Sequence, residues 1–186
     1  SHLTAVDRLR ALHAGPWPEL VLVLGSGLGD VIADIEVTCR FAYAEVPGFP
    51  QLGVAGHAGT LTVGTLGGTA VTVMQGREHF YENGRADAMA VPIRALRALG
   101  SETLLMTNAA GSIHPHMPPG SLMAVTDHIN LTGANPLIGN AAGDDRFVDM
   151  VGAYNPTLRE TIKASAQAAG LDIFEGVYVG FSGPSF

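Results

Sequence analysis

The sequence has a single cysteine, few charges and no long apolar run. Cys39 is the one cysteine among 186 residues, which excludes a disulfide framework and a thiolate metal site within one chain. No apolar run approaches the roughly 20 residues that a membrane-spanning helix needs. Residues 1–4 lack the basic and apolar regions of a signal peptide. We therefore expect a soluble, cytoplasmic protein with no membrane partner.

Basic clusters are also missing. The net charge is −7, with 10 Lys and Arg against 17 Asp and Glu, and no run of Lys or Arg occurs. Nucleic-acid binders usually present a basic patch, so we expect no nucleic-acid partner. Hydrophobic residues make up 47% of the chain and charged residues 15%, which gives ample apolar material for a core. We expect one domain over residues 1–186.

Several common site motifs are absent as well. No G-x-S-x-G nucleophile elbow occurs. Gly25, Gly27 and Gly29 are spaced too closely for the dinucleotide fingerprint, and no Gly-Lys-Ser/Thr follows them to make a P-loop. His114 and His116 could chelate a metal ion, but no nearby carboxylate or cysteine completes a ligand set. We therefore expect no metal site.

Apolar periodicity predicts alternating strands and helices. The apolar run 20–24 stops at a glycine and is typical of a strand buried on both faces. The runs 61–66 and 70–74 are joined by Gly67-Gly68, which is a hairpin signal. The other expected elements are helices at 4–13 (capped by Thr4 with Asp7), from Leu28 onward, at 89–99 (kinked or starting late at Pro92) and at 155–170, and strands at 103–107, 122–126 and 173–179. This order predicts an α/β fold, with a mixed central β-sheet flanked by helices on both faces.

The first candidate site is the glycine loop, residues 25–29, which follows a buried strand and precedes an expected helix. Glycines let the backbone approach a ligand, and the amides at a helix N-terminus attract an anion. Ser26 adds a hydroxyl donor. A phosphate is therefore a natural ligand, and a tight turn without a ligand is the alternative.

A second candidate lies just past the hairpin, where Arg77, His79 and Tyr81 alternate. Arginine can hold a phosphate with two parallel hydrogen bonds, and His79 can donate another. Tyr81 offers a hydroxyl and a flat ring to a sugar or base. Alternation after a strand end predicts that the three side chains share one side. A purely structural role is the alternative for a lone histidine.

Other segments are weaker candidates. They are the Gly-His-Ala-Gly segment around His57, the small residues of 107–112, which leave room for a ligand against the backbone, and 183–186, where an aromatic follows a rigid turn. A simple turn is the alternative for 107–112. Asp127 and His128 follow an expected strand, and charge pairing or packing is favoured for them over catalysis.

Seven segments resemble the trimeric purine nucleoside phosphorylases, the inosine and guanosine phosphorylase family, in order and spacing. They are 25–29, 46–50, 56–59, 75–82, 107–111, 127–131 and 183–186. The resemblance implies the nucleoside phosphorylase type of fold. It also implies that Phe186 lies about two-thirds of the way along a typical member. On that expectation the C-terminal third, with the residues that recognise the base, is absent, and this chain alone should not retain normal catalysis.

The resemblance further implies roles for individual residues. His57, Arg77 and His79 would be catalytic. Phosphate would be held by Ser26, His57, Arg77, His79 and the backbone amide of Ala109, and ribose and base would be contacted by Tyr81, Ala110, Phe147, Tyr178 and Phe186. Phe147 would reach the ribose pocket of a neighbouring subunit, which implies a homotrimer.

The implied reaction is phosphorolysis of purine (deoxy)ribonucleosides such as inosine and guanosine. Its products would be the free base and (deoxy)ribose 1-phosphate, in purine salvage, with inorganic phosphate as co-substrate and no cofactor. A 5′-methylthioadenosine phosphorylase, which shares the fold, is the nearest alternative. A dinucleotide-binding oxidoreductase and a nucleoside-binding module without catalysis are the others. Preference between 6-oxopurines and adenosine stays open.

Overall fold

The computed structural model describes residues 1–52, 59–139 and 147–184. Residue contacts divide the chain into two compact units, Ser1–Ala109 and Ala110–Phe186, and each is described by itself. The interpretation of residues 1–186 as one domain stays a prediction.

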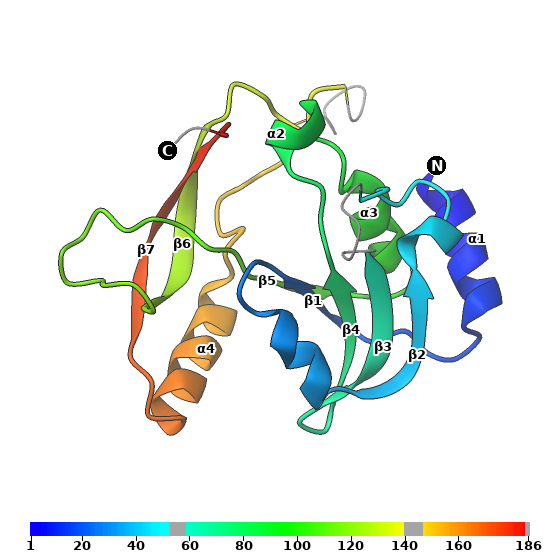
Figure 1. Ribbon diagram of the computed structural model, residues 1–186, viewed down its shortest axis with the longest axis horizontal. Coiled ribbons are helices and arrows are strands. Elements are labelled where there is room, and N and C mark those ends of the chain that lie inside the picture. The colour runs from blue at the N-terminus through cyan, green and yellow to red at the C-terminus, as the bar shows by residue number, and fades with distance from the viewer. Residues whose placement is uncertain (53–58, 140–146, 185–186) are drawn as a thin grey trace. The chain divides into compact units, whose positions relative to one another are not determined.

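The first unit contains a five-stranded mixed sheet in the order β2-β3-β4-β1-β5 (Figure 1). β1 lies between β4 and β5 and runs parallel to both, whereas β2, β3 and β4 pair antiparallel. The strands are β1 (Leu20–Leu24), β2 (Glu36–Ala42), β3 (Thr60–Leu66), β4 (Thr69–Gln75) and β5 (Thr103–Met106). The mixed central sheet that the sequence predicts is therefore confirmed.

The predicted hairpin is present, and one strand was not predicted. β3 and β4 are joined by Gly67 and Gly68, whose φ angles of +56° and +81° are those that a tight hairpin turn requires. β2 lies at the sheet edge, and Phe41 is its one buried residue. Because most of its side chains face solvent, β2 has neither the continuous apolar run nor the alternation that marks a strand in sequence.

β1 is buried on both faces, as its apolar run predicts. Val21 and Val23 pack in one core with α1 (His2–Leu12) and α3 (Ala90–Ala98), which lie side by side in Figure 1. Leu22 and Leu24 pack in a second core, against Val31 and Ile32 of the 3₁₀ helix η1 (Gly29–Asp34). Helical segments thus cover both faces, but the one expected from Leu28 onward is a short 3₁₀ helix.

Two helix starts can be compared with the sequence prediction. α1 begins at His2, and the Ser1 side chain caps it by accepting a hydrogen bond from the Thr4 amide at 3.5 Å. The predicted cap by Thr4 with Asp7 is therefore wrong. Pro92 is the third residue of α3, where no intrahelical donor is lost, so it marks a late helix start and not a kink.

The second unit pairs β6 (Leu122–Leu131) with β7 (Ile173–Phe181) in parallel, joined through α4 (Pro156–Ala168). The Asn155 side chain caps α4 by accepting from the Leu158 amide at 3.1 Å, as predicted. Both strands run past their predicted ends. The Glu175 carboxylate binds Lys163 at 2.9 Å and Arg159 at 3.0 Å, which ties β7 to α4.

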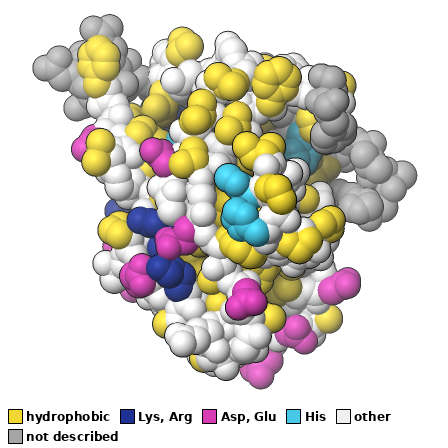
Figure 2. All heavy atoms as spheres, turned by 90° about the vertical axis from the view of Figure 1, so that its left-hand side faces the viewer, with side chains coloured by type: hydrophobic (Ala, Val, Ile, Leu, Met, Phe, Trp, Pro, Cys, Tyr) yellow, Lys and Arg dark blue, Asp and Glu magenta, His cyan; other side chains and the backbone are white. Residues whose placement is uncertain are grey.

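Figure 2 shows one face of the molecule, with basic and acidic side chains next to one another and hydrophobic side chains spread over much of the remainder. Among the described residues, no helix has both the length and the apolar character that crossing a membrane takes.

Tyr43 connects the start of the hairpin to its end. It opens the short 3₁₀ helix η2 (Tyr43–Glu45) and is 2% exposed. Its amide donates to the Gly59 carbonyl at 2.8 Å, and its hydroxyl donates to the Gly76 carbonyl at 2.9 Å. Burial raises the pKa of the Tyr43 hydroxyl. This tyrosine therefore fixes the chain directly before Arg77.

Replacing Tyr43 by Phe removes this buried hydrogen bond while keeping the ring. We expect the free energy of unfolding at neutral pH to fall by about 1 kcal/mol, because the Gly76 carbonyl loses a partner. Urea unfolding measures it. Tyr81→Phe, at a side chain that is 55% exposed, is the control and should leave the midpoint unchanged. Equal stability of Y43F and the parent protein would contradict the assignment.

The same variant should change the response to alkaline pH. Because the pKa of Tyr43 is raised in the folded state, the unfolded chain loses this proton first, at about pH 10. The stability that neutral Tyr43 contributes is therefore complete below about pH 10 and is lost as pH rises above it. Urea unfolding between pH 8 and pH 11 should show that the free energy of unfolding falls less steeply with rising pH in Y43F than in the parent protein.

Candidate active site

Three chain segments leave the sheet at one edge. Leu24 of β1 pairs with Gln75 of β4, and Val23 pairs with Met106 of β5. Because these neighbouring strands are parallel, the segments that follow their carboxyl ends emerge together, which is where ligands bind in open α/β sheets. The segments are the glycine loop 25–29, residues 76–81 and residues 107–109. They contain five of the residues that the sequence analysis selects: Ser26, Arg77, His79, Tyr81 and Ala109.

Thr107 joins the glycine loop to the end of β5. Its hydroxyl accepts a hydrogen bond from the Gly25 amide at 2.8 Å and donates to the Val23 carbonyl at 3.3 Å. A β-carbon on residue 25 would lie 2.2 Å from the Thr107 carbonyl oxygen. Glycine is therefore required here by the close approach of two backbones.

Arg77 is half-buried and directed by the backbone. Its Nη1 donates to the Thr107 carbonyl at 2.8 Å. Gly76, just before it, has a φ angle of +97°, and a β-carbon there would lie 2.4 Å from the Leu52 side chain. The chain thus turns sharply after β4, and the guanidinium is held at the strand edge with a neutral oxygen as its partner.

His79 and Tyr81 lie together, although not as alternating residues of a strand. β4 ends at Gln75, and His79 precedes the helix α2 (Phe80–Asn83), where its amide donates to the Glu82 carboxylate at 2.6 Å. The two rings stack with centroids 5.1 Å apart and planes 9° apart. The side chains of His79 and Tyr81 therefore lie on one side, as expected, but the start of α2, and not strand alternation, brings them together.

Ser26 and Ala109 are both exposed, and they lie two residues after the end of β1 and three residues after the end of β5. The segment after the glycine loop is the six-residue 3₁₀ helix η1 and not the expected α-helix. Its dipole is correspondingly small, so the predicted attraction of an anion by a helix N-terminus is not available here. Side chains and single backbone amides remain as the anion donors of this edge.

The remaining selected residues belong to the second unit or lie outside the described residues. Ala110, Phe147 and Tyr178 belong to the second unit, where Phe147 is 76% exposed and Tyr178 is half-buried in β7. His57 and Phe186 lie outside the described residues. Within the first unit, the structure therefore brings the segments that contain Ser26, Arg77, His79 and Ala109 to one edge of the sheet.

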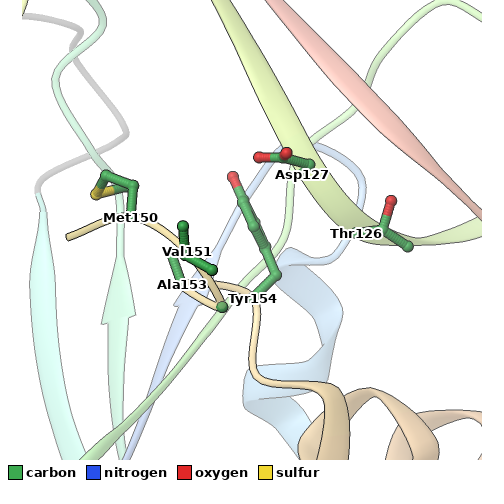
Figure 3. Close-up of a pocket in the computed structure, with 7 residues that line it drawn as sticks. Thr126, Asp127, Met150, Val151, Ala153 and Tyr154 are labelled. Carbon is green, nitrogen blue, oxygen red and sulfur yellow. The ribbon is translucent and has the colours of Figure 1, made fainter.

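A pocket of about 350 Å³ in the second unit was not predicted (Figure 3). Thr126 and Asp127 of β6 line one side, and residues 150–154 line the other. The Tyr154 hydroxyl bonds the His128 Nδ1 at 3.1 Å, and burial, followed by the charge of Asp127, raises the pKa of Tyr154. Asp127 and His128 lie inside β6, and His128 packs as expected. No sequence pattern marks residues 150–154.

Metal ligands do not converge in the part of the chain that the structure describes. No group of three or more His, Cys, Asp and Glu side chains there could hold an ion. The ring centroids of His114 and His116 lie 5.4 Å apart, and those of His116 and Phe174 lie 6.0 Å apart. This histidine pair therefore takes part in an aromatic cluster.

Comparison with known proteins places the chain in a family. The model of the phosphorylase superfamily matches residues 19–186. The chain is 46% identical to purine nucleoside phosphorylase 1 of Geobacillus stearothermophilus over 171 residues, which is 91% of this chain and 62% of that protein. It is 39% identical to the purine nucleoside phosphorylase of Bos taurus, covering 94% of this chain and 63% of that one. The chain thus spans less than two thirds of the length of these relatives.

Solved structures agree. The purine nucleoside phosphorylase of Schistosoma mansoni, crystallised with acetate, superposes with a TM-score of 0.90 at 33% identity, covering 100% of this chain and 70% of that one. A purine nucleoside phosphorylase in complex with ribose 1-phosphate superposes equally well, with the same identity and coverage. These likenesses cover the sheet edge described above as well as the second unit. The chain belongs to the phosphorylase superfamily, among the purine nucleoside phosphorylases.

Proposed function

We propose that the protein carrying this sequence catalyses phosphorolysis of purine nucleosides, giving a free purine base and ribose 1-phosphate. The observation that supports this most is the position of Arg77, held by the Thr107 carbonyl at the edge where three parallel strands end. A named relative is solved with ribose 1-phosphate, which is the expected product.

The proposed phosphate site uses Ser26, Arg77, His79 and the Ala109 amide. The chain carries a net charge of −7, so its overall field repels a phosphate dianion. A local cation is therefore needed, and Arg77 supplies one whose partner at 2.8 Å is an uncharged carbonyl. Its remaining N–H groups can bind phosphate oxygens bidentately. The Ser26 hydroxyl and His79 add donors from the neighbouring segments.

The proposed ribose and base contacts come from Tyr81, Ala110, Phe147, Tyr178 and Phe186. The stacking of His79 on Tyr81 supports the contact by Tyr81, because it places an exposed ring beside a residue that is proposed to donate a hydrogen bond to phosphate. The contribution of Phe147 to a neighbouring site, and the homotrimer that this requires, remain part of the proposal. The catalytic and phosphate-binding role of His57 and a cytoplasmic location also remain part of the proposal.

The mechanism that this site supports is one of positioning and electrostatics. As the bond between C1′ of the ribose and N9 of the purine lengthens, positive charge develops on the sugar ring. A phosphate fixed by Arg77, His79 and Ser26 below the ring stabilises that charge and then bonds to C1′, while the base leaves with the bonding electrons. Inorganic phosphate is the co-substrate, and the proposed steps require no metal or organic cofactor.

Inosine and guanosine are the proposed substrates. Related Schistosoma enzymes are solved with hypoxanthine and with adenosine, so the family's pocket holds 6-oxo and 6-amino purines in those proteins. A 5′-methylthioadenosine phosphorylase is the alternative, although Ser26 and the segments around His57 and Arg77 fit the purine nucleoside enzyme better. The substrate preference separates the two.

The direct test is to incubate the full-length protein that carries this sequence with inosine or 5′-methylthioadenosine, with and without phosphate. We expect hypoxanthine and ribose 1-phosphate from inosine, at a rate that depends on phosphate, and little release of adenine from methylthioadenosine. Faster turnover of methylthioadenosine would transfer the assignment to the alternative. Absence of phosphate-dependent release from any purine nucleoside would refute it.

Substitution of Arg77 tests the phosphate site. Arg77→Met should lower kcat/KM by roughly 100- to 1,000-fold, because the transition state loses its local cation. Arg77→Lys keeps the charge but loses the planar guanidinium that can donate two parallel hydrogen bonds. We therefore expect an intermediate loss of kcat/KM, mainly through a higher KM for phosphate. Phosphate-saturation kinetics with inosine measure both.

Arg97→Met is the matched control for Arg77. Arg97 also donates from Nη1 to a backbone carbonyl, that of Ser101 at 3.1 Å, but it lies on α3. Its loss should leave kcat and both KM values unchanged. Equal losses in R77M and R97M would mean that a general structural defect, and not phosphate binding, accounts for the effect.

A further inference from the structure

We propose that Thr107 is the positioning residue of the phosphate site: its hydroxyl and carbonyl hold the glycine loop and Arg77 in fixed relation to each other. The inference rests on the proposed function and extends it to a residue that need not touch the substrate. Thr107 is half-buried, follows β5 and directly precedes the segment that contains Ala109.

The hydroxyl of Thr107 is used in both directions. It accepts from the Gly25 amide at 2.8 Å and donates to the Val23 carbonyl at 3.3 Å, and the Thr107 amide donates to that same carbonyl at 3.0 Å. A donor on one side and an acceptor on the other favour a single orientation of this hydroxyl. The first residue of the glycine loop is thereby bound to the end of β5, across 82 positions of the sequence.

The carbonyl of Thr107 carries the second connection. It accepts from Arg77 Nη1 at 2.8 Å, and it faces Gly25 so closely that a β-carbon there would lie 2.2 Å away. That β-carbon would also lie 2.9 Å from the Asn108 Cα. A displacement of Thr107 therefore moves the guanidinium and the glycine loop at the same time.

Both connections act on groups that are proposed to bind phosphate. Ser26 follows Gly25, Arg77 is hydrogen-bonded to the Thr107 carbonyl, and Ala109 is two residues beyond Thr107. An anion gains most from donors that are already in place, because the protein then spends no free energy on reorganising them. Removing the hydroxyl should therefore weaken phosphate binding without altering the base or ribose contacts.

Thr107→Val tests this, since it keeps the shape of the side chain and removes only the hydroxyl. In the full-length protein we expect the KM for phosphate to rise about tenfold, and the KM for inosine to change by less than about twofold. Thr107→Ser keeps the hydroxyl and should restore the phosphate KM to within about threefold of the parent value. Calorimetric titration with inorganic phosphate should follow the same order.

Thr72→Val is the matched control. Thr72 lies in β4 of the same sheet and is fully buried, and its hydroxyl has no hydrogen-bond partner among the residues that the structure describes. The same chemical change there should leave phosphate KM and affinity unchanged. If T107V does not fold, Thr107→Ala removes the same hydroxyl without adding apolar bulk at that point, and the same rise in phosphate KM is expected.

Two results would overturn the inference: a phosphate KM and affinity in T107V (or T107A) equal to those of the parent and of T72V, or a loss in T107S as large as that in T107V. A parent protein that binds phosphate but shows no phosphorolysis would instead refute the proposed function. In that case the phosphate titrations of T107V, T107S and T72V still decide the role of Thr107.

Discussion

The parallel pairing of β1 with β4 and β5 is the constraint on which the candidate site depends. It aligns the carboxyl ends of three strands that are far apart in sequence, so that loops 25–29, 76–81 and 107–109 begin at the same sheet edge. The alignment is stable because β1 is apolar on both faces, with Val23 in one core and Leu24 in the other. A charge on either side of β1 would disturb the strand and the site together.

The elements that carry a distinctive local pattern could be predicted from the sequence. β1 has cores on both sides, the hairpin has two glycines in its turn, and α4 has Asn155, Pro156 and Gly170 at its ends, so each could be identified from a few adjacent residues. β2 could not, because an edge strand with exposed side chains has no distinctive pattern. A helix was expected from Leu28 onward because the segment follows a strand and a glycine loop, but it forms only the short 3₁₀ helix η1. Its glycine, aspartate and β-branched residues have low α-helix propensity.

The candidate site shows the same division. Arg77, His79 and Ser26 could be selected because their side-chain chemistry and position after strands suit an anion. Thr107 was selected only as part of a segment of small residues, since its importance lies in hydrogen bonds to Gly25 and Arg77, 82 and 30 positions away. Such contacts follow from strand order, which the sequence does not state. The stacking of His79 on Tyr81 likewise depends on the start of α2, and strand alternation is not its cause.

The partner of Arg77 explains how an acidic chain can offer a site to an anion. Among the residues that the structure describes, Arg77 forms no ion pair, whereas Arg85, Arg97 and Arg159 each meet a carboxylate. A carboxylate in place of the Thr107 carbonyl would fix the guanidinium equally well but would cancel most of its charge. A carbonyl supplies direction through one N–H and leaves the positive charge and the other N–H groups for a ligand. Because the guanidinium is half-buried, that charge is poorly screened by water. In the proposed site, the preference for an anion would therefore come from the charge of Arg77 at the sheet edge, in a chain whose net charge is −7.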